Sequence, residues 1–444
     1  MVLNVVYMLA FVLLLPWVAW RRFSGARPVA APWTRFTGAV VPVPRRDGVP
    51  RIWLHGVSVG EVQLLASLAA ELGRQADASG RPVECVISSS TTTGLDVAAR
   101  RFGPDRTFPC PLDFTWAVDN VLDRVRPDLL VLGELELWPN LLARTRARNL
   151  PIIVANARMS GRSAAGYARI RPLVGRMLQR VSLVAARSQQ DADRFVSLGA
   201  GDVTVTGSMK FDGVKGDRHA ADVSRLQQLA GIGDDDIVFL AGSTQAPEEQ
   251  FAIAAFRSLA AGHPRLRLVI VPRHVERTPE ITALLDGTGL RWQKRSLLDR
   301  AGADPAARIL LVDATGELGW WWGTAAIAFV GGSLDGKRGG QNMLEPAAYG
   351  AAVCFGPHTR NFQDEVRVLH EADAAEIVAD GAALRAFLKR CLDDPAWARA
   401  LGGRAAATVS ARRGATAATA ALILSRLSPA KPGETGCQEM PLPR

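Results

Sequence analysis

Paired cysteines, clustered metal ligands and a dinucleotide-binding glycine motif are all missing from this chain of 444 residues. Its five cysteines are odd in number and form no C-x-x-C pair, which argues against a disulfide framework or a zinc cluster and favours a reducing compartment. No G-x-G-x-x-G follows the first apolar run, so a dinucleotide-dependent oxidoreductase is not expected. Histidine and acidic residues nowhere gather at metal-ligand spacing. The sequence therefore predicts neither a metal site nor a cofactor.

Acidic residues are in the minority, and the net charge is +10. The excess is local, because residues 21–51 contain seven arginines and one aspartate, a net of +6. With no zinc finger and no basic-aromatic stripe, we expect no nucleic-acid partner. The hydrophobic content of 48% and charged content of 22% are globular values, and the length suits two domains of about 180 residues each.

The N-terminal segment has the pattern of a membrane anchor. Val2 to Trp20 is apolar apart from Asn4 and Tyr7, and nineteen residues at about 1.5 Å each can just cross about 30 Å of hydrocarbon. Arginines follow the segment, so the positive-inside rule places the body of the protein on the cytoplasmic side. We expect an anchor at 1–22, either spanning or lying shallowly in the membrane. The basic segment 23–50 then either binds anionic membrane lipids or is a plain linker.

Beyond residue 50, short apolar runs alternate with helical stretches, which is typical of parallel α/β domains. We expect a first Rossmann-like domain at 51–212, a linker at 213–236, a second such domain at 237–427 and a disordered tail at 428–444. The predicted strands are 51–57, 83–88, 128–133, 151–156, 181–186 and 202–206, then 237–241, 267–271, 309–312, 326–330 and 352–355. The predicted helices include 61–74, 115–126, 189–198, 247–261, 276–286, 316–322 and 361–370.

The most informative stretch is 327–364, IAFVGGSLDGKRGGQNMLEPAAYGAAVCFGPHTRNFQD. An apolar run ends at Gly331, Gly332 and Ser333, and a glycine-rich loop leads into a helix that carries Glu345. A strand, a glycine loop and a helix N-terminus in this order let backbone N–H groups face an anionic ligand. Glu345 can accept hydrogen bonds from sugar hydroxyls.

This block resembles the nucleotide-binding half of bacterial 3-deoxy-D-manno-octulosonic acid (Kdo) transferases. The resemblance continues in the family's order through eight motifs spread over roughly 310 residues, the last of which lies at the end of this block. They are HGVSVGEV (55–62), GELELWPN (133–140), ANARMSGRSAAGY (155–167), VTGSMKFD (205–212), AGSTQAPEE (241–249), VPRHVER (271–277), TGEL (315–318) and GPHTRNFQD (356–364).

The resemblance implies a GT-B fold, in which two wound domains face each other across a cleft. It also implies a glycosyltransferase of lipopolysaccharide biosynthesis that moves Kdo from CMP-Kdo to a lipid A precursor, with inversion and without a metal ion. Such an enzyme works at the cell inner membrane, with its catalytic domains on the cytoplasmic side. The number of Kdo residues transferred, the acyl-chain preference and the oligomeric state do not follow from the sequence.

Three residues of the first domain are the expected catalytic group. Glu61 follows the first strand at the start of a helix, and by likeness to the family's SVGE motif it is the general base that takes the acceptor's proton. Glu134 corresponds to the first glutamate of the family's Glu-Thr-Glu pattern and is expected to stabilise the transition state. Lys210 precedes the linker, and its ammonium can neutralise charge on the donor carboxylate or the departing phosphate.

Further contacts of the first domain are expected at the same strand ends. Glu136 should lie on the same side of an extended segment as Glu134. Ser58, Arg158 and Arg162 are possible substrate contacts. Glycine precedes Glu134, and leucine follows it where the family pattern has threonine, which leaves the local hydrogen bonding open.

The second domain is expected to bind the nucleotide along the carboxyl ends of its strands. The predicted nucleotide-binding residues are Pro272, Arg273, Thr315, Gly316, Glu317, Asn342, Met343, Leu344 and Glu345. Possible further contacts are Ser243, Thr244, Gly331, Gly332 and Ser333. Gln341 and Gln245 stand where the family has histidines, so any protonated-histidine contact with phosphate is lost.

Two other functions fit part of the pattern. A GT-B glycosyltransferase with a UDP-sugar donor would share the fold and the Glu345 region, but it would have no use for carboxylate recognition by Lys210 or the arginines. A non-catalytic, membrane-tethered scaffold that binds a nucleotide sugar or a lipid is the second alternative, motivated by Gln341 and Gln245.

Overall fold

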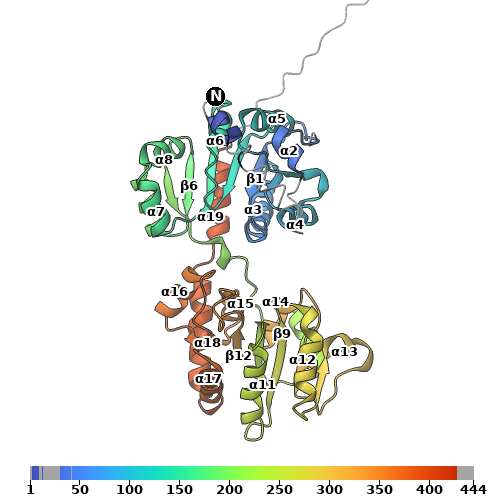
Figure 1. The fold of residues 1–444 in the computed structure, drawn as a ribbon. Coiled ribbons are helices and arrows are strands. Elements are labelled where there is room, and N and C mark those ends of the chain that lie inside the picture. The colour runs from blue at the N-terminus through green and yellow to red at the C-terminus, as the bar shows by residue number, and fades with distance from the viewer. Residues whose placement is uncertain (1–2, 10–12, 14–30, 42, 428–444) are drawn as a thin grey trace, which may run out of the picture. The chain divides into compact units, whose positions relative to one another are not determined.

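The computed structural model describes residues 3–9, 13, 31–41 and 43–427. The chain forms two compact units (Figure 1). Unit 1 comprises the described residues up to Gly213 together with those from Arg413, and unit 2 is Val214–Arg412. Each unit is built around one parallel sheet, as the alternating pattern of the sequence predicts.

The sheet of unit 1 has seven strands in the order β3-β2-β1-β4-β5-β6-β7. All neighbouring strands are parallel, and β1 lies between β2 and β4. The strands are β1 Arg51–Gly56, β2 Glu84–Ser89, β3 Thr107–Pro109, β4 Leu129–Gly133, β5 Ile152–Ala157, β6 Leu183–Ala186 and β7 Val203–Val205.

Helices cover both faces of this sheet. One core contains side chains of α5, α6, α8 and α9, and the other contains side chains of α3, α4 and α19. The helices are α2 Pro32–Thr37, α3 Val59–Ala78, α4 Thr92–Phe102, α5 Thr115–Val125, α6 Pro139–Ala147, α7 Gly161–Ala168, α8 Arg171–Leu178, α9 Gln189–Ser197 and α19 Ala415–Ser425.

The C-terminal helix α19 belongs to unit 1, although the sequence pattern assigned residues up to 427 to the second domain. Its Ala420 and Ile423 are buried with Leu65 of α3 and neighbouring apolar residues. The carboxylate of Asp212 accepts the N–H groups of Gly414 and Thr416, both at 2.6 Å, and so satisfies free donors at the helix start. Hydrophobic periodicity predicts a helix but not the sheet on which it packs, which explains the difference.

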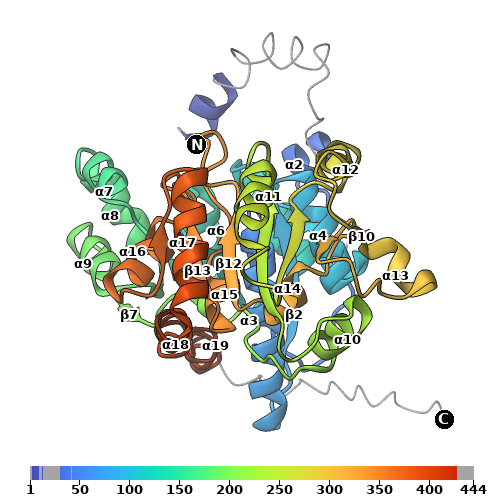
Figure 2. The ribbon, with the colours of Figure 1, turned by 90° about the horizontal axis from the view of Figure 1, so that it is seen from below.

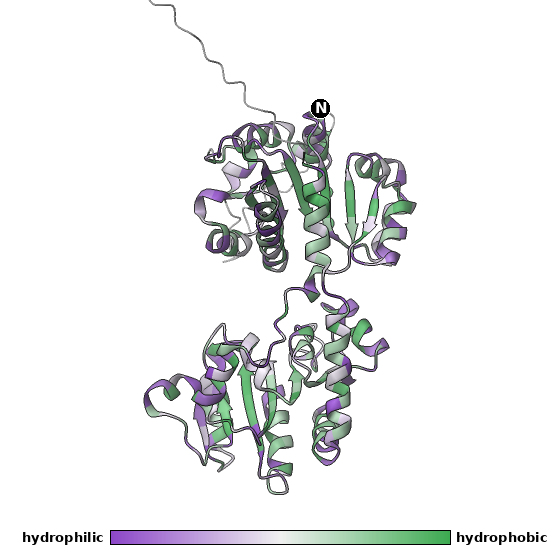
Figure 3. Ribbon diagram, turned by 180° about the vertical axis from the view of Figure 1, so that it is seen from behind, coloured by the Kyte–Doolittle hydropathy of each residue, from purple (hydrophilic) through white to green (hydrophobic). Residues whose placement is uncertain are grey.

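The sheet of unit 2 also has seven parallel strands, in the order β10-β11-β9-β8-β12-β13-β14. The strands are β8 Ile237–Thr244, β9 Leu266–Pro272, β10 Trp292–Lys294, β11 Ile309–Leu311, β12 Ile327–Val330, β13 Ala352–Phe355 and β14 Glu376–Ile377. The two longest, β8 and β9, lie in the middle of the sheet. Strands buried on both faces explain why the sequence shows continuous apolar runs here instead of alternation, and Figure 3 shows the strands as hydrophobic segments.

Helices of unit 2 enclose its sheet, and α11 and α17 lie side by side over one face (Figure 2). The helices are α10 Ala221–Ala230, α11 Glu248–Leu259, α12 Thr278–Asp286, α13 Arg295–Ala301, α14 Leu318–Trp321, α15 Leu344–Ala348, α16 Gln363–Glu371, α17 Gly381–Asp393 and α18 Pro395–Ser410. The described residues also form 3₁₀ turns, which are η1 Pro104–Arg106 and η2 Met209–Phe211 in unit 1 and η3 Val275–Arg277 and η4 Trp322–Thr324 in unit 2.

The expected linker 213–236 is not a simple connection, because it contains α10. Val223, Leu226 and Ala230 of this helix are buried at helical spacing, so a short apolar stripe inside a charge-rich stretch suffices to fold it onto unit 2. The strands β3, β10 and β14 are absent from the predicted set. Each is short and has no continuous apolar run (TFP, WQK and EI), unlike the equally short β7 and β11, which lie in the predicted runs 202–206 and 309–312.

Part of the predicted anchor is described. Residues 3–9 are helical, and the side chains of Asn4 and Tyr7 bond to Thr115 and Asp113 of unit 1. Among the described residues, no helix is long and apolar enough to cross a membrane. Residues 1–2, 10–12 and 14–22 of the predicted anchor, 23–30 and 42 of the basic segment and the predicted tail 428–444 lie outside the described residues.

Candidate active site

The strand orders create one switch point in each sheet, where successive crossovers leave in opposite directions. In unit 1 it lies between β1 and β4, and in unit 2 between β8 and β12. Ligands of open α/β sheets bind at the carboxyl ends of the strands at such a point. Glu61 and Glu134 follow β1 and β4, and Gly331 to Ser333 follow β12. The predicted site residues therefore lie at the two switch points.

Glu61 is held at the start of α3 by three short-range contacts. Its Oε2 accepts the N–H of Val57 at 2.8 Å, its Oε1 accepts the hydroxyl of Ser58 at 2.8 Å, and the Ser58 Oγ caps the N–H of Glu61 at 3.3 Å. A Cβ on Gly133 would lie 3.8 Å from Glu61 Oε2. The tighter contact of such a Cβ would be with the carbonyl oxygen of His55, at 3.2 Å, so glycine suits the end of β4.

Glu134 directly follows β4 in an unusual conformation. Its φ is 57°, in the left-handed region that residues with a side chain seldom adopt. The expected extended run through Glu134 and Glu136 is therefore wrong at Glu134, because the backbone turns there. Burial raises the pKa of the Glu134 carboxyl, the charge of Glu61 raises it further, and Arg187, Lys210 and Arg158 oppose the rise. The pKa of Glu136 is also raised by burial, while the indole of Trp138 donates to it at 2.8 Å.

The electrostatic coupling shows which predicted residues the fold brings together. The charges of Glu61, Arg158 and Lys210 all act on the Glu134 carboxyl, at the carboxyl edge of the unit 1 sheet. Arg162 lies exposed on α7, outside the group of charges that act on Glu134. The structure thus separates the two arginines that the sequence pattern treated alike.

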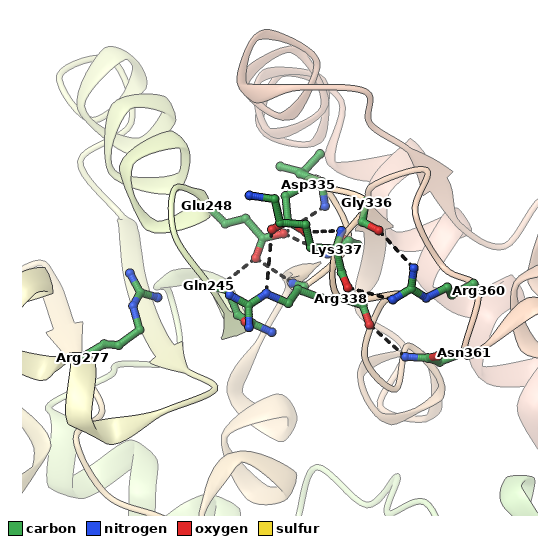
Figure 4. Close-up of polar contacts among 12 residues, drawn as sticks. Gln245, Glu248, Arg277, Asp335, Gly336, Lys337, Arg338, Arg360 and Asn361 are labelled. Atoms are coloured by element: carbon green, nitrogen blue, oxygen red, sulfur yellow. Dashed lines mark hydrogen bonds and ion pairs between the residues drawn. The ribbon is translucent and has the colours of Figure 1, made fainter. Parts of the chain in front are cut away.

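In unit 2 the glycine-rich loop after β12 is bound by an internal carboxylate. Glu248, the first residue of α11, is 2% exposed and accepts the N–H groups of Gly332 (2.7 Å), Ser333 (2.9 Å) and Leu334 (3.1 Å). A fourth N–H, that of Gln245, donates to it at 2.9 Å. These N–H groups were predicted to face an anionic ligand. In the structure the anion that they bind is the Glu248 carboxylate (Figure 4).

The middle of the same loop is fixed by the segment after β13. Arg360 donates to the carbonyls of Gly336 (3.3 Å) and Lys337 (2.8 Å), and the side chain of Asn361 donates to the carbonyl of Arg338 at 3.0 Å. Figure 4 shows Arg360 and Asn361 beside the loop. The exposed side chains of Lys337 and Arg338 are thereby presented from a backbone of defined shape.

Glu345 lies in the first turn of α15 and is already engaged by neighbours. Its carboxylate accepts from Asn342 Nδ2 at 3.1 Å and from the Trp322 indole at 3.0 Å. Burial raises its pKa, and the positive charges of Lys215 and Arg273 lower it. The Lys215 ammonium itself lies 2.9 Å from the centroid of the Trp320 ring. An acid, two cations and an indole face thus meet at one end of the unit 2 sheet.

The remaining predicted residues of unit 2 divide into accessible and engaged ones. Arg273, Thr315 and Gly316 are exposed. Glu317 pairs with Arg295 at 2.8 Å. The other predicted residues are buried, so a ligand would meet them mainly through their backbone: Ser243, Thr244, Pro272, Gly331, Gly332, Ser333, Met343 and Leu344.

The two glutamines that replace family histidines lie on either side of one glycine. A Cβ on Gly332 would be 3.3 Å from Gln245 Nε2 and 3.4 Å from Gln341 Nε2. Both amides therefore lie at the β8–β12 switch point. Neutral donors stand there in place of groups that could carry charge.

The predicted set lacks Glu248, Arg187 and Lys215. It also lacks Asn156 and Ser208, which lie next to the turn of Lys210, because Asn156 Oδ1 accepts the N–H of Met209 at 3.1 Å. Arg187 and Asn156 stand at strand ends, a position that already singled out the predicted residues. Lysine is scarce in this chain, with six residues, and the same scarcity that drew attention to Lys210 applies to Lys215. Ser208 carries no signal in the sequence beyond its place beside Lys210.

Comparison with known proteins agrees with this geometry. A profile of the family described as "3-Deoxy-D-manno-octulosonic-acid transferase (kdotransferase)" matches residues 32–213. The 3-deoxy-D-manno-octulosonic acid transferase of Haemophilus influenzae is 32% identical over 82% of this chain and 84% of its own length. The enzyme of the same name from Bordetella pertussis is 32% identical over 91% of this chain and 93% of its own.

A solved structure supports the fold alone. The UDP-GlcNAc 2-epimerase from Neisseria meningitidis, bound to UDP-GlcNAc, superposes with a TM-score of 0.53 at 12% identity, covering 85% of this chain and 99% of that one. From the identity and coverage of the two transferases, we conclude that this chain belongs to the 3-deoxy-D-manno-octulosonic acid (Kdo) transferase family of glycosyltransferases.

Proposed function

We propose that this Kdo transferase moves Kdo from CMP-Kdo to a hydroxyl group of a lipid A precursor, lipid IVA. One observation carries the proposal: in a chain of this family, the charges of Glu61 and Lys210 both act on the carboxyl group of Glu134, which follows β4 at the unit 1 switch point. A base, a second acid and a cation are the groups that a transfer from an anionic sugar donor needs.

Glu61 serves as the general base. Its carboxylate is oriented by Val57 N–H and Ser58 Oγ, and it keeps further lone pairs with which to take the proton of the acceptor hydroxyl. The hydroxyl oxygen attacks the anomeric carbon of the donor as the bond to phosphate breaks. A single displacement of this kind inverts the configuration and involves no metal ion.

Lys210 and Glu134 act on charge that changes during the reaction. The Lys210 ammonium offsets negative charge on the departing CMP phosphate. Because its pKa is raised, Glu134 is protonated more readily than an ordinary glutamate. The neutral form can donate a hydrogen bond, and the ionised form can stabilise positive charge.

Unit 2 binds the nucleotide of the donor. Asn342 and Glu345 face the ribose hydroxyls, and the cations near Glu345, Arg273 and Lys215, face the phosphate. Gln245 and Gln341 supply neutral hydrogen bonds at the same edge. Glu345→Gln should weaken CMP binding by about 1–3 kcal/mol through the loss of a charged hydrogen bond, with little change in the donor-saturated rate.

We further propose that the protein works at the cytoplasmic face of the inner membrane. The apolar segment 2–20 and the arginines after it support this placement, as does the 52–79% exposure of Val5, Val6, Leu9 and Leu13. A lipid acceptor would then lie beside the active site. Flotation of the protein with liposomes, compared with a variant that starts at residue 31, tests the placement; equal flotation of both would refute it.

Release of CMP tests the transfer itself. Purified protein is incubated with CMP-Kdo and tetraacylated lipid IVA, with and without EDTA, and the mass of the lipid product is measured by mass spectrometry. We expect CMP release and a mass gain of whole Kdo units in both conditions. Absence of release in both conditions refutes the proposal, and stabilisation by UDP but not by CMP would point to a UDP-sugar transferase.

A further inference from the structure

Two buried hydrogen-bond donors of unit 1 lie side by side without partners. Asn156 is 1% exposed and Ser208 is 8% exposed. Among the described residues, nothing bonds to Asn156 Nδ2 or Ser208 Oγ. Leaving a buried polar group unpaired destabilises the fold, so two of them together require an explanation.

The two groups are held next to each other by the backbone. The N–H of Met209, the residue after Ser208, donates to Asn156 Oδ1 at 3.1 Å. Only the amide oxygen can accept this bond, so the unpaired atom of Asn156 is the NH₂ donor. Asn156 also has a left-handed backbone, with a φ of 54°, which is a conformation associated with functional sites.

Two cationic residues stand at the neighbouring strand ends. Arg187 follows β6, is 8% exposed, and its N–H donates to the carbonyl of Ala157 at 3.1 Å. Lys210 lies in η2, two residues after Ser208. Because β5, β6 and β7 are neighbours in the sheet, their carboxyl ends bring an amide, a hydroxyl, a guanidinium and an ammonium to one place.

We propose that Asn156 Nδ2, Ser208 Oγ and the Arg187 guanidinium form an anion-binding site for a carboxylate or phosphate group of a substrate. Neutral donors combined with a buried guanidinium bind the two oxygens of such a group with charge-assisted hydrogen bonds. This inference rests on the proposed function, which offers two sources of the anion: the carboxylate of the Kdo donor and a phosphate of the lipid acceptor. Asn156 has a second effect, because its bond to Met209 positions the turn that carries Lys210.

Asn156→Asp is the sharpest test of the site. Aspartate keeps the oxygen that accepts from Met209 and also tolerates a left-handed backbone, but it replaces the NH₂ donor by an acceptor and adds a negative charge. We expect the KM for the substrate that carries the anion to rise at least tenfold, and kcat at saturation to change less than KM. Ser208→Ala, which removes only a hydroxyl, should raise the same KM several-fold.

Asn149→Asp is the matched control. Asn149 is the same residue type with a φ of 58°, but it is exposed on the surface of unit 1. The substitution adds the same charge in the same backbone conformation, so we expect wild-type KM values. A similar rise in this variant would mean that net charge, not the site, causes the effect, and it would overturn the inference.

The source of the anion follows from which KM changes. A rise for CMP-Kdo alone identifies the sugar carboxylate, and a rise for lipid IVA alone identifies a lipid phosphate. Unchanged KM values in folded Asn156→Asp and Ser208→Ala overturn the site, as does a fall in kcat without any KM change. Calorimetry measures the binding of free Kdo and of inorganic phosphate to wild type and to Asn156→Asp, and so separates failure of the site from failure of the proposed function. If wild type binds either probe more tightly than Asn156→Asp but releases no CMP, only the proposed function is refuted.

Discussion

Replacing Glu134 should make the protein more stable and less active. Its φ of 57° places a residue with a side chain in the left-handed region, which costs about 1–2 kcal/mol. Burial and the neighbouring charge of Glu61 also disfavour its ionised form, as the raised pKa shows. Both features oppose folding, so the residue is retained for a reason other than stability.

Two substitutions separate the features. Glu134→Gln removes the charge and keeps the backbone strain, whereas Glu134→Gly removes both. Glycine releases about 1–2 kcal/mol of strain but loses about 0.5–1 kcal/mol through the greater freedom of the unfolded chain. The glycine variant should therefore be more stable than the glutamine variant by about 0–1.5 kcal/mol, and a gain of 1 kcal/mol corresponds to roughly 2–4 °C in Tm for a domain of this size.

The pH dependence distinguishes the charge from the strain. Because the folded-state pKa of Glu134 is raised, the ionised carboxylate destabilises the fold at neutral pH, and the penalty disappears as pH falls through the folded pKa and the group takes up a proton. The advantage of Glu134→Gln over wild type should be largest near pH 7 and vanish near pH 4.5 and below. The added gain of glycine over glutamine should persist across this range.

Urea unfolding at several pH values, followed by tryptophan fluorescence, measures these differences. Arg126→Gly is the control for strain alone, because Arg126 is exposed and has a φ of 48°. If both Glu134 variants were less stable than wild type by more than about 1 kcal/mol at pH 7, the interactions with Arg187, Lys210 and Arg158 would outweigh burial and the reasoning would be wrong. CMP release by both variants should fall.

Three further changes probe individual contacts. Glu61→Gln removes the base but keeps its size, so kcat should fall at least about 10²-fold while CMP affinity measured by calorimetry stays near wild type; near-full kcat would place the base elsewhere. Lys215→Met removes the cation above Trp320 and should weaken CMP binding about fivefold, and an unchanged Kd would exclude the contact. Arg360→Lys keeps the charge but cannot bond to the carbonyls of Gly336 and Lys337 together, so the KM for CMP-Kdo should rise several-fold. Arg367→Lys on α16 is the control and should leave this KM unchanged. Equal KM values for both variants would show that the bonds of Arg360 to the loop are unimportant.

Much of the fold follows from the sequence because long apolar runs in parallel sheets are unambiguous. The predicted runs at 51–57 and 237–241 correspond to β1 and β8. The predicted sites after them follow from a rule of topology, since carboxyl ends of parallel strands share one edge. Family likeness supplied the roles of Glu61 and Lys210, which geometry alone would not assign.

What the sequence did not show depends on contacts between distant segments. The destination of α19 is set by Asp212, about 200 positions earlier, and by an apolar face on α3. The carboxylate in the glycine loop comes from Glu248, more than 80 positions upstream. Neither contact leaves a periodic trace, and a glycine loop that binds a protein carboxylate looks the same in sequence as one that binds a ligand.

The return of α19 to unit 1 makes unit 2 an insertion within the chain of unit 1. Residues 214–412 contain every strand of the second sheet and can be produced as one continuous fragment for study of nucleotide binding. A fragment that stops at 213 would instead lose the helix that covers Leu65 and its apolar neighbours on α3. A truncation from the C-terminus that removes residues of α19 therefore damages the unit that carries Glu61, although the cut lies more than 350 residues away from it.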